Sequence, residues 1–259
     1  MSDFVLSPDA PFAVRFSSSM TQIRSAALSD IGRVRRNNED RFLHDEEAML
    51  FGVADGVGGL PGGAEAAQRT VEEIAAAVKA VPPSEKPDLA EIILKANDVI
   101  HRLGAVLSPV MGIGSTLTCG QIRDHTLILA HVGDSRCYSW RKGEFIPLTN
   151  DHSVENEARM RRARGEVIYY HEANRNALTR CMGQPGSPQV DIVERLLRSG
   201  DRYLFCTDGI TRMVRDDELA DLIGKDQPPE EVLREIITLA VRRGGPDNAT
   251  GVLVYIDEP

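Results

Sequence analysis

The residues best suited to chemistry are four aspartates, Asp55, Asp134, Asp208 and Asp247, each next to an apolar run. A further polar signature, Arg-Arg-Asn-Asn-Glu-Asp at 35–40, precedes the first of them. Short apolar runs predict buried strands, and such strands would deliver these side chains to one edge of the sheets. Carboxylates gathered in this way repel one another unless cations lie between them.

Each of these signatures is weak when it stands alone. An Asp-Gly pair after a strand, as at Asp55-Gly56 and Asp208-Gly209, is usually a turn. In such a turn the Asp side chain bonds the local backbone and the Gly takes a positive φ. Because the pattern recurs along the chain, a shared site is favoured over a set of separate turns.

Oxygen ligands without paired His or Cys suit hard cations such as Mg²⁺ or Mn²⁺ rather than zinc. A water that bridges two such ions has a lowered pKa. It can then attack a phosphoryl group as hydroxide. Gly56 fits this interpretation, because a residue without a side chain can turn its carbonyl oxygen toward a metal. The sequence therefore predicts a metal centre suited to phosphoryl chemistry.

Hydrophobic periodicity indicates the elements that would position these residues. Helices are predicted over 64–80, 88–103, 155–164, 216–223 and 228–244. Strands are predicted within 49–55, 114–122, 125–134, 135–143, 144–149, 202–208 and 249–257, with a hairpin turn at Arg141–Glu144. Four of the helices come in pairs instead of alternating with strands. This order favours packed sheets with helices outside over a doubly wound parallel sheet.

One domain over residues 22–257 is expected, preceded by an N-terminal extension over 1–21 that contains Pro8 and Pro11. Residues from about 150 to 178 are polar and strongly charged, which predicts a mobile flap. The arginine-rich run at 159–164 has two interpretations, a solvated helix face or a set of cationic contacts to a phosphopeptide.

The signatures RRNNED, DGVGG, GDSR, TDG and GGPDN, in this order and at comparable spacing, resemble the bacterial metal-dependent PP2C-type (PPM) protein phosphatases. The resemblance runs from about residue 22 to 257. It implies an α+β fold, a four-layer αββα sandwich in which two packed, mainly antiparallel β-sheets are flanked by helix pairs. It also implies hydrolysis of phosphoserine and phosphothreonine in phosphoproteins at a dinuclear Mn²⁺ or Mg²⁺ centre, opposing a bacterial Ser/Thr kinase.

The resemblance assigns roles at the metal centre. Asp55 would bridge the two core metals, with the Gly56 carbonyl on one of them, while Asp208 and Asp247 would complete the second. Asp134 and Asp208 would bind a third, weaker ion. Nothing in these residues separates Mn²⁺ from Mg²⁺, since both take the same oxygen ligands.

The resemblance also assigns roles around the metals. Glu39 and Asp40 would hold metal-bound waters, and Arg35 would clamp the substrate phosphate with its guanidinium fork. The reverse assignment of Arg35 and its neighbour Arg36 stays open. Two further residues are expected to support the site: Asn248, which would brace the Asp247 loop, and His152.

One position departs from the family pattern. Eukaryotic relatives carry a His directly after Asp-Gly, proposed as the acid that protonates the leaving alcohol. Here that residue is Val57, and Leu60 stands where some bacterial members have His. A metal-bound water would then have to serve as the acid. A pH–rate profile that is insensitive to replacing the remaining histidines is the expected sign.

Composition limits the location and the partners. The chain has 30 basic and 39 acidic residues, a formal charge of -9, which disfavours nucleic acid and anionic membranes as partners. The four cysteines are scattered, and no apolar run approaches the length of a bilayer span. Because the N-terminal residues lack the pattern of a signal peptide, a cytoplasmic location is expected. A monomer is the default expectation, and phosphoproteins are the partners that the resemblance implies.

Two other functions would leave different signs in the sequence. A catalytically dead module that only binds phosphoproteins would typically lose a metal carboxylate, yet Asp55, Asp208 and Asp247 are all present. A partner-switching regulator acting on one small phosphoprotein would usually diverge at RRNNED and GDSR and carry a sensor domain. Neither feature applies, so a phosphatase is the favoured interpretation.

Overall fold

Two antiparallel five-stranded sheets form the centre of the molecule. The computed structural model describes residues 21–58, 61–82 and 84–259. The first sheet has the order β1 (Gln22–Asp30), β10 (Ala249–Glu258), β9 (Arg202–Cys206), β6 (Arg136–Arg141) and β7 (Glu144–Pro147). The second has the order β2 (Asp40–Asp45), β3 (Leu50–Asp55), β4 (Leu117–Arg123), β5 (Thr126–Val132) and β8 (Asp191–Leu196). Every strand pair in both sheets is antiparallel.

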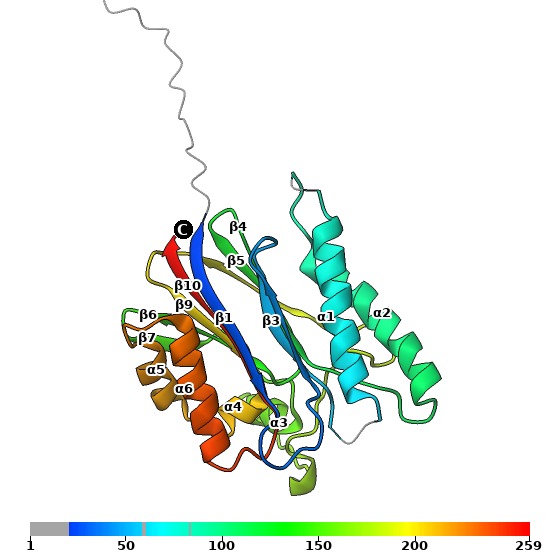
Figure 1. Cartoon of the computed structure of the whole chain (residues 1–259). Helices are drawn as coiled ribbons and strands as arrows, with labels where there is room; N and C mark the ends of the chain where they lie inside the picture. Colours follow the sequence, from blue (N-terminus) through cyan, green and yellow to red (C-terminus); the bar gives the residue numbers. More distant parts are fainter. Residues whose placement is uncertain (1–20, 59–60, 83) are drawn as a thin grey trace, which may run out of the picture.

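Helices cover the outer face of each sheet, as Figure 1 shows. α1 (Gly63–Ala80) packs on β2 and β3, and α2 (Leu89–Leu107) lies against α1. On the other side, α6 (Pro229–Arg242) packs on β1 and β10, next to α4 (Asp208–Thr211) and α5 (Asp216–Ile223). The predicted four-layer αββα sandwich is confirmed.

Three apolar cores separate the four layers, because strand side chains alternate between the two faces of a sheet. On β10, Val252 and Val254 point between the sheets, where they meet Phe51 and Phe205. The alternate residues of β10, including Leu253, face α6 and form the second core. The third core joins α1 and α2 to the outer face of the second sheet.

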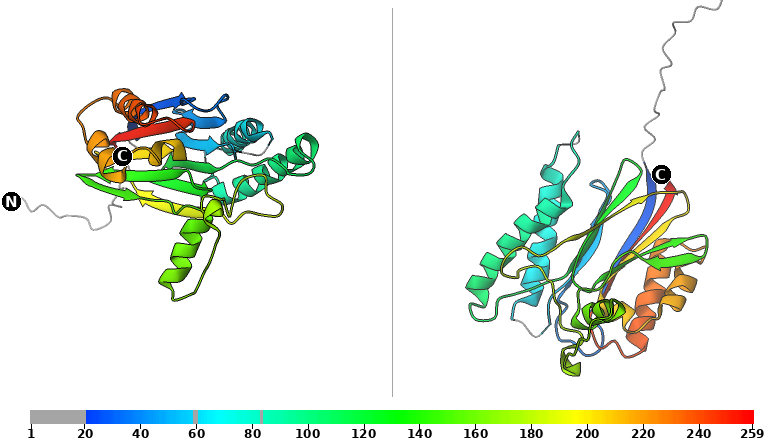
Figure 2. Two further views of the ribbon diagram at one scale, coloured as in Figure 1. Left: turned by 90° about the horizontal axis from the view of Figure 1, so that it is seen from below. Right: turned by 180° about the vertical axis from the view of Figure 1, so that it is seen from behind.

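The flap helix α3 (Val154–Ala163) stands out from the sandwich, as the left view in Figure 2 shows. It begins at Ser153, whose hydroxyl accepts from the backbone N–H of Asn156, and Glu155 and Glu157 lie in its first turn. A short 3₁₀ turn, η1 (Glu172–Asn174), follows before the chain returns to the body. Among the described helices, none is both long and apolar enough to cross a membrane.

The sequence-based elements agree with the structure except for three edge or terminal strands and two short helices. β1, β2 and β8 were not predicted as strands, and η1 and α4 were not predicted as helices. β8 is a sheet edge that pairs only with β5 and is exposed along most of its length, so its sequence lacks the apolar run of a buried strand. The expected extension over 1–21 lies outside the described residues except for Thr21.

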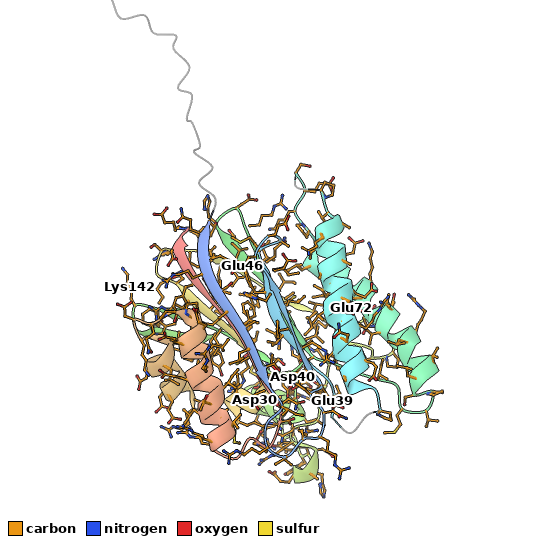
Figure 3. The ribbon with its side chains drawn as sticks, in the orientation of Figure 1. Asp30, Glu39, Asp40, Glu46, Glu72 and Lys142 are labelled. Carbon is orange, nitrogen blue, oxygen red and sulfur yellow. The ribbon has the colours of Figure 1, made fainter. Side chains whose placement is uncertain are left out.

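The ends of the strands place the acidic signatures at one end of the sandwich. Asp55 ends β3, Asp40 begins β2 directly opposite it, and Asp247 precedes β10. In Figure 3, Asp30, Glu39 and Asp40 lie together at this end, whereas Glu46 lies at the other. The antiparallel topology therefore brings together residues that are far apart in the sequence.

Candidate active site

A cavity of about 660 Å³ opens at the end of the sandwich where the acidic signatures meet. Eight of the ten predicted site residues line it: Arg35, Glu39, Asp55, Gly56, Asp134, Asp208, Asp247 and Asn248. Asp40 is buried behind them, and His152 is buried nearby without lining the cavity.

Asp55 and Asp40 are held side by side by the pairing of β2 with β3. The backbone N–H of Asp55 donates to Thr116 Oγ1 at 2.9 Å, which locks the end of β3 against the loop before β4. Asp40 Oδ2 accepts from Thr207 Oγ1 at 2.9 Å, while its Oδ1 is buried without a hydrogen-bond partner among the described residues. An unsatisfied carboxylate oxygen at this depth is costly and indicates a missing ligand.

Asp208 and Asp247 are brought together by the close approach of α4 to the start of β10. A Cβ on Gly209 would lie 1.9 Å from the Asn248 carbonyl oxygen, so only glycine allows this contact. Asn248 then ties its loop to the 31–39 segment. Its Oδ1 accepts from Glu39 N at 2.8 Å, and its Nδ2 donates to the carbonyls of Ile31 and Asn37.

Arg35 enters the cavity and pairs with Asp247, with 2.8 Å between Nη2 and Oδ2. Its guanidinium lies against the backbone of Gly58, where a Cβ would stand 3.2 Å from both terminal nitrogens. Arg36 is exposed and does not line the cavity. Of the two adjacent arginines, Arg35 therefore has the position from which a phosphate could be bound.

The carboxylates shift one another's pKa values upward. Burial and the neighbouring acids Asp40 and Asp208 raise the pKa of Asp55 well above its ordinary value. Burial and the negative charge of Asp208 raise the pKa of Asp134 to about 7, although the positive charge of Arg212 partly opposes this rise. Burial also raises the pKa of Asp40 to about 6. Without further positive charge, the cluster would hold protons near neutral pH.

The residues fit divalent ions that keep much of their hydration. Their donors are all oxygens, and Asp40 Oδ1 and Asp208 Oδ1 are buried without partners among the described residues. Within the described chain, no three His, Cys, Asp or Glu side chains converge tightly enough to enclose an ion by themselves. Mg²⁺ and similar ions are commonly held by one or two carboxylates and several waters, so this spacing suits them.

The glycine after Asp55 has a packing role as well. A Cβ on Gly56 would lie 2.5 Å from the backbone carbonyl group of Gly63 at the start of α1, which no side chain could tolerate. Val57 lines the cavity where a proton-donating His would be expected, and no histidine lines it among the described residues. Leu60 lies outside the described residues.

Comparison with known proteins agrees with this geometry. The sequence profile described as "Protein phosphatase 2C" matches residues 15–249, most of the chain. The chain belongs to the protein phosphatase 2C family. This family is metal-dependent, and its members hydrolyse phosphate esters on proteins.

Individual relatives of this phosphatase support the assignment. It is 31% identical over 239 residues to protein phosphatase PhpP of Streptococcus pneumoniae, which covers 89% of this chain and 96% of PhpP. The S. agalactiae serine/threonine phosphatase is 31% identical with a TM-score of 0.79, covering 91% of this chain and all of that one (100%). The catalytic domain of PstP, solved with two manganese ions, is 30% identical with a TM-score of 0.77, covering 91% and 99%.

Sequence reasoning missed three residues of the phosphatase site. Thr116 and Thr207 hold Asp55 and Asp40 through their hydroxyls, and no pattern in the sequence links either to its partner. Arg212 lines the cavity and pairs with Asp208. Because Arg212 follows Asp208, the first residue of α4, by four positions, the spacing in the sequence could have predicted this ion pair.

His152 braces the loop that carries Asp134. Its backbone N–H donates to the Gly133 carbonyl at 2.7 Å, and its Nδ1 accepts from the Gly133 N–H at 3.1 Å. With Nδ1 as acceptor, Nε2 carries the proton and donates to Asp191 Oδ2 at 3.1 Å. His152 thus holds the loop that carries Asp134 through hydrogen bonds to the carbonyl and the N–H of Gly133, and it does not line the cavity.

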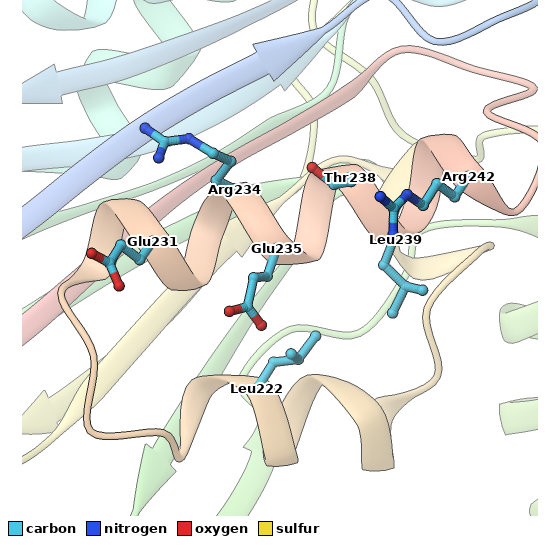
Figure 4. Close-up of a pocket in the computed structure, with 7 residues that line it drawn as sticks. All are labelled: Leu222, Glu231, Arg234, Glu235, Thr238, Leu239 and Arg242. Atoms are coloured by element: carbon cyan, nitrogen blue, oxygen red, sulfur yellow. The ribbon is translucent and has the colours of Figure 1, made fainter.

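A second cavity, of about 600 Å³, lies between α5 and α6 of the phosphatase (Figure 4). Its acidic lining residues are Glu231 and Glu235, and Glu235 is paired with Lys225 at 2.5 Å. The cluster of aspartates lines the 660 Å³ cavity and not this one, so the 660 Å³ cavity is the candidate active site.

Proposed function

We propose that this chain hydrolyses phosphoserine and phosphothreonine in proteins at a dinuclear Mn²⁺ or Mg²⁺ centre. The observation that carries the proposal is the meeting of Asp55, Asp208 and Asp247 in one cavity with Arg35 beside them. When bound, the two ions would neutralise phosphate charge and lower the pKa of the attacking water. No covalent enzyme intermediate is needed.

Each residue has a proposed part in the reaction. Asp55 and the Gly56 carbonyl would hold the core ions, and Asp208 and Asp247 would complete the second. Glu39 and Asp40 would orient waters around these ions. Arg35 would bind the phosphate oxygens, because a guanidinium fork matches two of them at once.

The proposed partner is a bacterial Ser/Thr kinase whose phosphorylation the chain reverses, and the proposed substrates are that kinase and its targets. Support comes from the family and from relatives that are named serine/threonine phosphatases. A monomeric state and a cytoplasmic location stay predictions, because they rest on the sequence alone.

The test is hydrolysis of a phosphothreonine peptide with and without added Mn²⁺, comparing wild type with Asp55→Asn. We expect metal-dependent phosphate release that falls by at least about 100-fold in the variant, since one charged ligand is lost from the centre. Asp226→Asn, an exposed acid outside the cavity, is the matched control and should keep full activity. Turnover by wild type after complete chelation, or full activity in Asp55→Asn, would refute the proposal.

A further inference from the structure

The cavity holds a second arginine that the proposed chemistry does not use. Arg212 follows α4, lines the cavity and places Nη2 at 2.5 Å from Asp208 Oδ2. Its effect extends to a second acid, because its positive charge lowers the pKa of Asp134 against burial and Asp208, which raise it. Arg212 therefore acts on a pair of acids, Asp134 and Asp208.

The two oxygens of Asp208 differ in their surroundings. Oδ2 is in the ion pair with Arg212, whereas Oδ1 is buried and has no hydrogen-bond partner among the described residues. One oxygen is thus free for a core ion, and the other already has a cationic partner. An ion between Asp134 and Asp208 would have to displace the guanidinium or share that oxygen with it.

The two arginines divide the acidic cluster between them. Arg35 pairs with Asp247 and is near enough to Glu39 and Asp55 for their charges to raise its pKa. Arg212 pairs with Asp208 and also acts on Asp134, while the charge of Arg35 reaches Asp208 without an ion pair between them. Arg35 thus lies with Asp247, and Arg212 lies with Asp208 and Asp134.

We propose that Arg212 is a built-in cation that occupies the part of the cavity between Asp134 and Asp208 and excludes a third divalent ion from it. The inference rests on the proposed metal centre and extends it. The guanidinium supplies the positive charge that a third ion would otherwise supply, and it leaves Asp208 Oδ1 to the core. The chain then works with two bound ions, and Arg212 sets that number.

The experiment measures how many Mn²⁺ ions the chain binds, by following the electron paramagnetic resonance signal of free Mn²⁺ during titration of metal-free protein. Wild type is expected to take up two ions per chain, with a third binding only weakly. Arg212→Gln keeps the length of the side chain but removes its charge. We expect this variant to bind the third ion at least about tenfold more tightly, since a positive charge next to the ion is lost.

Three further variants make the result specific. Arg212→Lys keeps the charge and should bind as wild type does. Asp134→Asn in the Arg212→Gln background should abolish the additional binding, because that acid would be its ligand. Arg234→Gln removes a positive charge from α6, outside this cavity, and should leave the titration unchanged.

Several outcomes would overturn the inference. These are a wild-type chain that already binds three ions with similar affinity, an Arg212→Gln titration that superimposes on wild type, or an Arg212→Lys variant that behaves as Arg212→Gln does. An unchanged titration with a raised KM for phosphopeptide would instead make Arg212 a substrate ligand. Metal counting does not depend on turnover, so failure of the proposed phosphatase reaction would be seen separately in the peptide assay.

Discussion

Arg35 and Arg36 are neighbours in the sequence, yet they differ in their access to the chemistry. Arg35 lies over Gly58 and pairs with Asp247, while Arg36 is exposed outside the cavity. The backbone of the 32–39 loop decides this difference, since it is anchored by Asn248 and by the bond from Arg33 N to the Gly245 carbonyl. At the residue scale, a one-position shift separates an arginine that lines the cavity, the proposed phosphate ligand, from one that lies outside it.

Replacing Arg35 with Lys should lower kcat/KM for a phosphopeptide by about 10- to 100-fold. The reason is that a lysine cannot donate from two nitrogens at once, so a charged hydrogen bond of roughly 1.5–3 kcal/mol is lost. Steady-state kinetics at saturating Mn²⁺ measures the change. Arg36→Lys is the matched control and should stay within about twofold of wild type. A larger loss in Arg36→Lys than in Arg35→Lys would reverse the assignment of the two arginines.

At the scale of elements, the site depends on how closely α4 approaches β10. α4 carries Asp208 and Gly209, and the loop before β10 carries Asp247 and Asn248. Because a Cβ at Gly209 would overlap the Asn248 carbonyl, this contact also sets how far apart Asp208 and Asp247, the proposed metal ligands, lie. Their separation is a property of helix and strand packing and not of either loop alone.

Gly209→Ala should therefore destabilise the fold by about 2–4 kcal/mol and weaken Mn²⁺ binding, since α4 must move away from β10. Urea unfolding and metal titration measure the two effects. Gly112→Ala is the control: its Cβ would meet nothing within 4 Å, so only its positive φ of 72° adds a cost of about 1–2 kcal/mol. Equal losses in the two variants, with unchanged metal binding in both, would contradict the packing argument.

At the scale of the whole molecule, acidic groups at the ends of several strands are gathered at one end of the sandwich. The chain carries a formal charge of -9, and part of that charge is concentrated in the cavity. The pKa of Asp134 is raised to about 7 in the folded state, so between its ordinary value and about 7 the folded chain holds a proton that the unfolded chain has released. Stability from this group is therefore fully present below its ordinary pKa, falls progressively as the pH rises, and is lost once the pH has passed about 7.

In the presence of a chelator, Asp134→Asn should raise the Tm relative to wild type by about 5 °C or more at pH 8, and by less than half as much at pH 5. The reason is that the variant removes a charge that is costly only when the carboxyl group is ionised. Thermal unfolding at the two pH values measures the difference. A gain of equal size at both pH values would show that ionisation of Asp134 is not responsible.

Much of the fold followed from local patterns. The buried strands β3, β5 and β9 and the helices α1, α2 and α6 have strong apolar periodicity, and their types were predicted. The edge strands β2 and β8 were missed, because each pairs on one side only and needs no continuous apolar run. For the site, the acidic residues were found from their signatures, but Thr116, Thr207 and Arg212 were not.

The sequence by itself determined which kind of chemistry to expect, because Asp, Glu and Arg side chains in five ordered signatures predict oxygen ligands for metals and an arginine that binds phosphate. The tertiary structure decided which atoms are free to act. It pairs one oxygen of Asp208 with Arg212 and leaves the other without a hydrogen-bond partner among the described residues, and it brings Arg35 rather than Arg36 into the cavity. The physical reason is that ligand types are carried by each residue, whereas burial and ion pairing depend on loops that meet only when both sheets have packed.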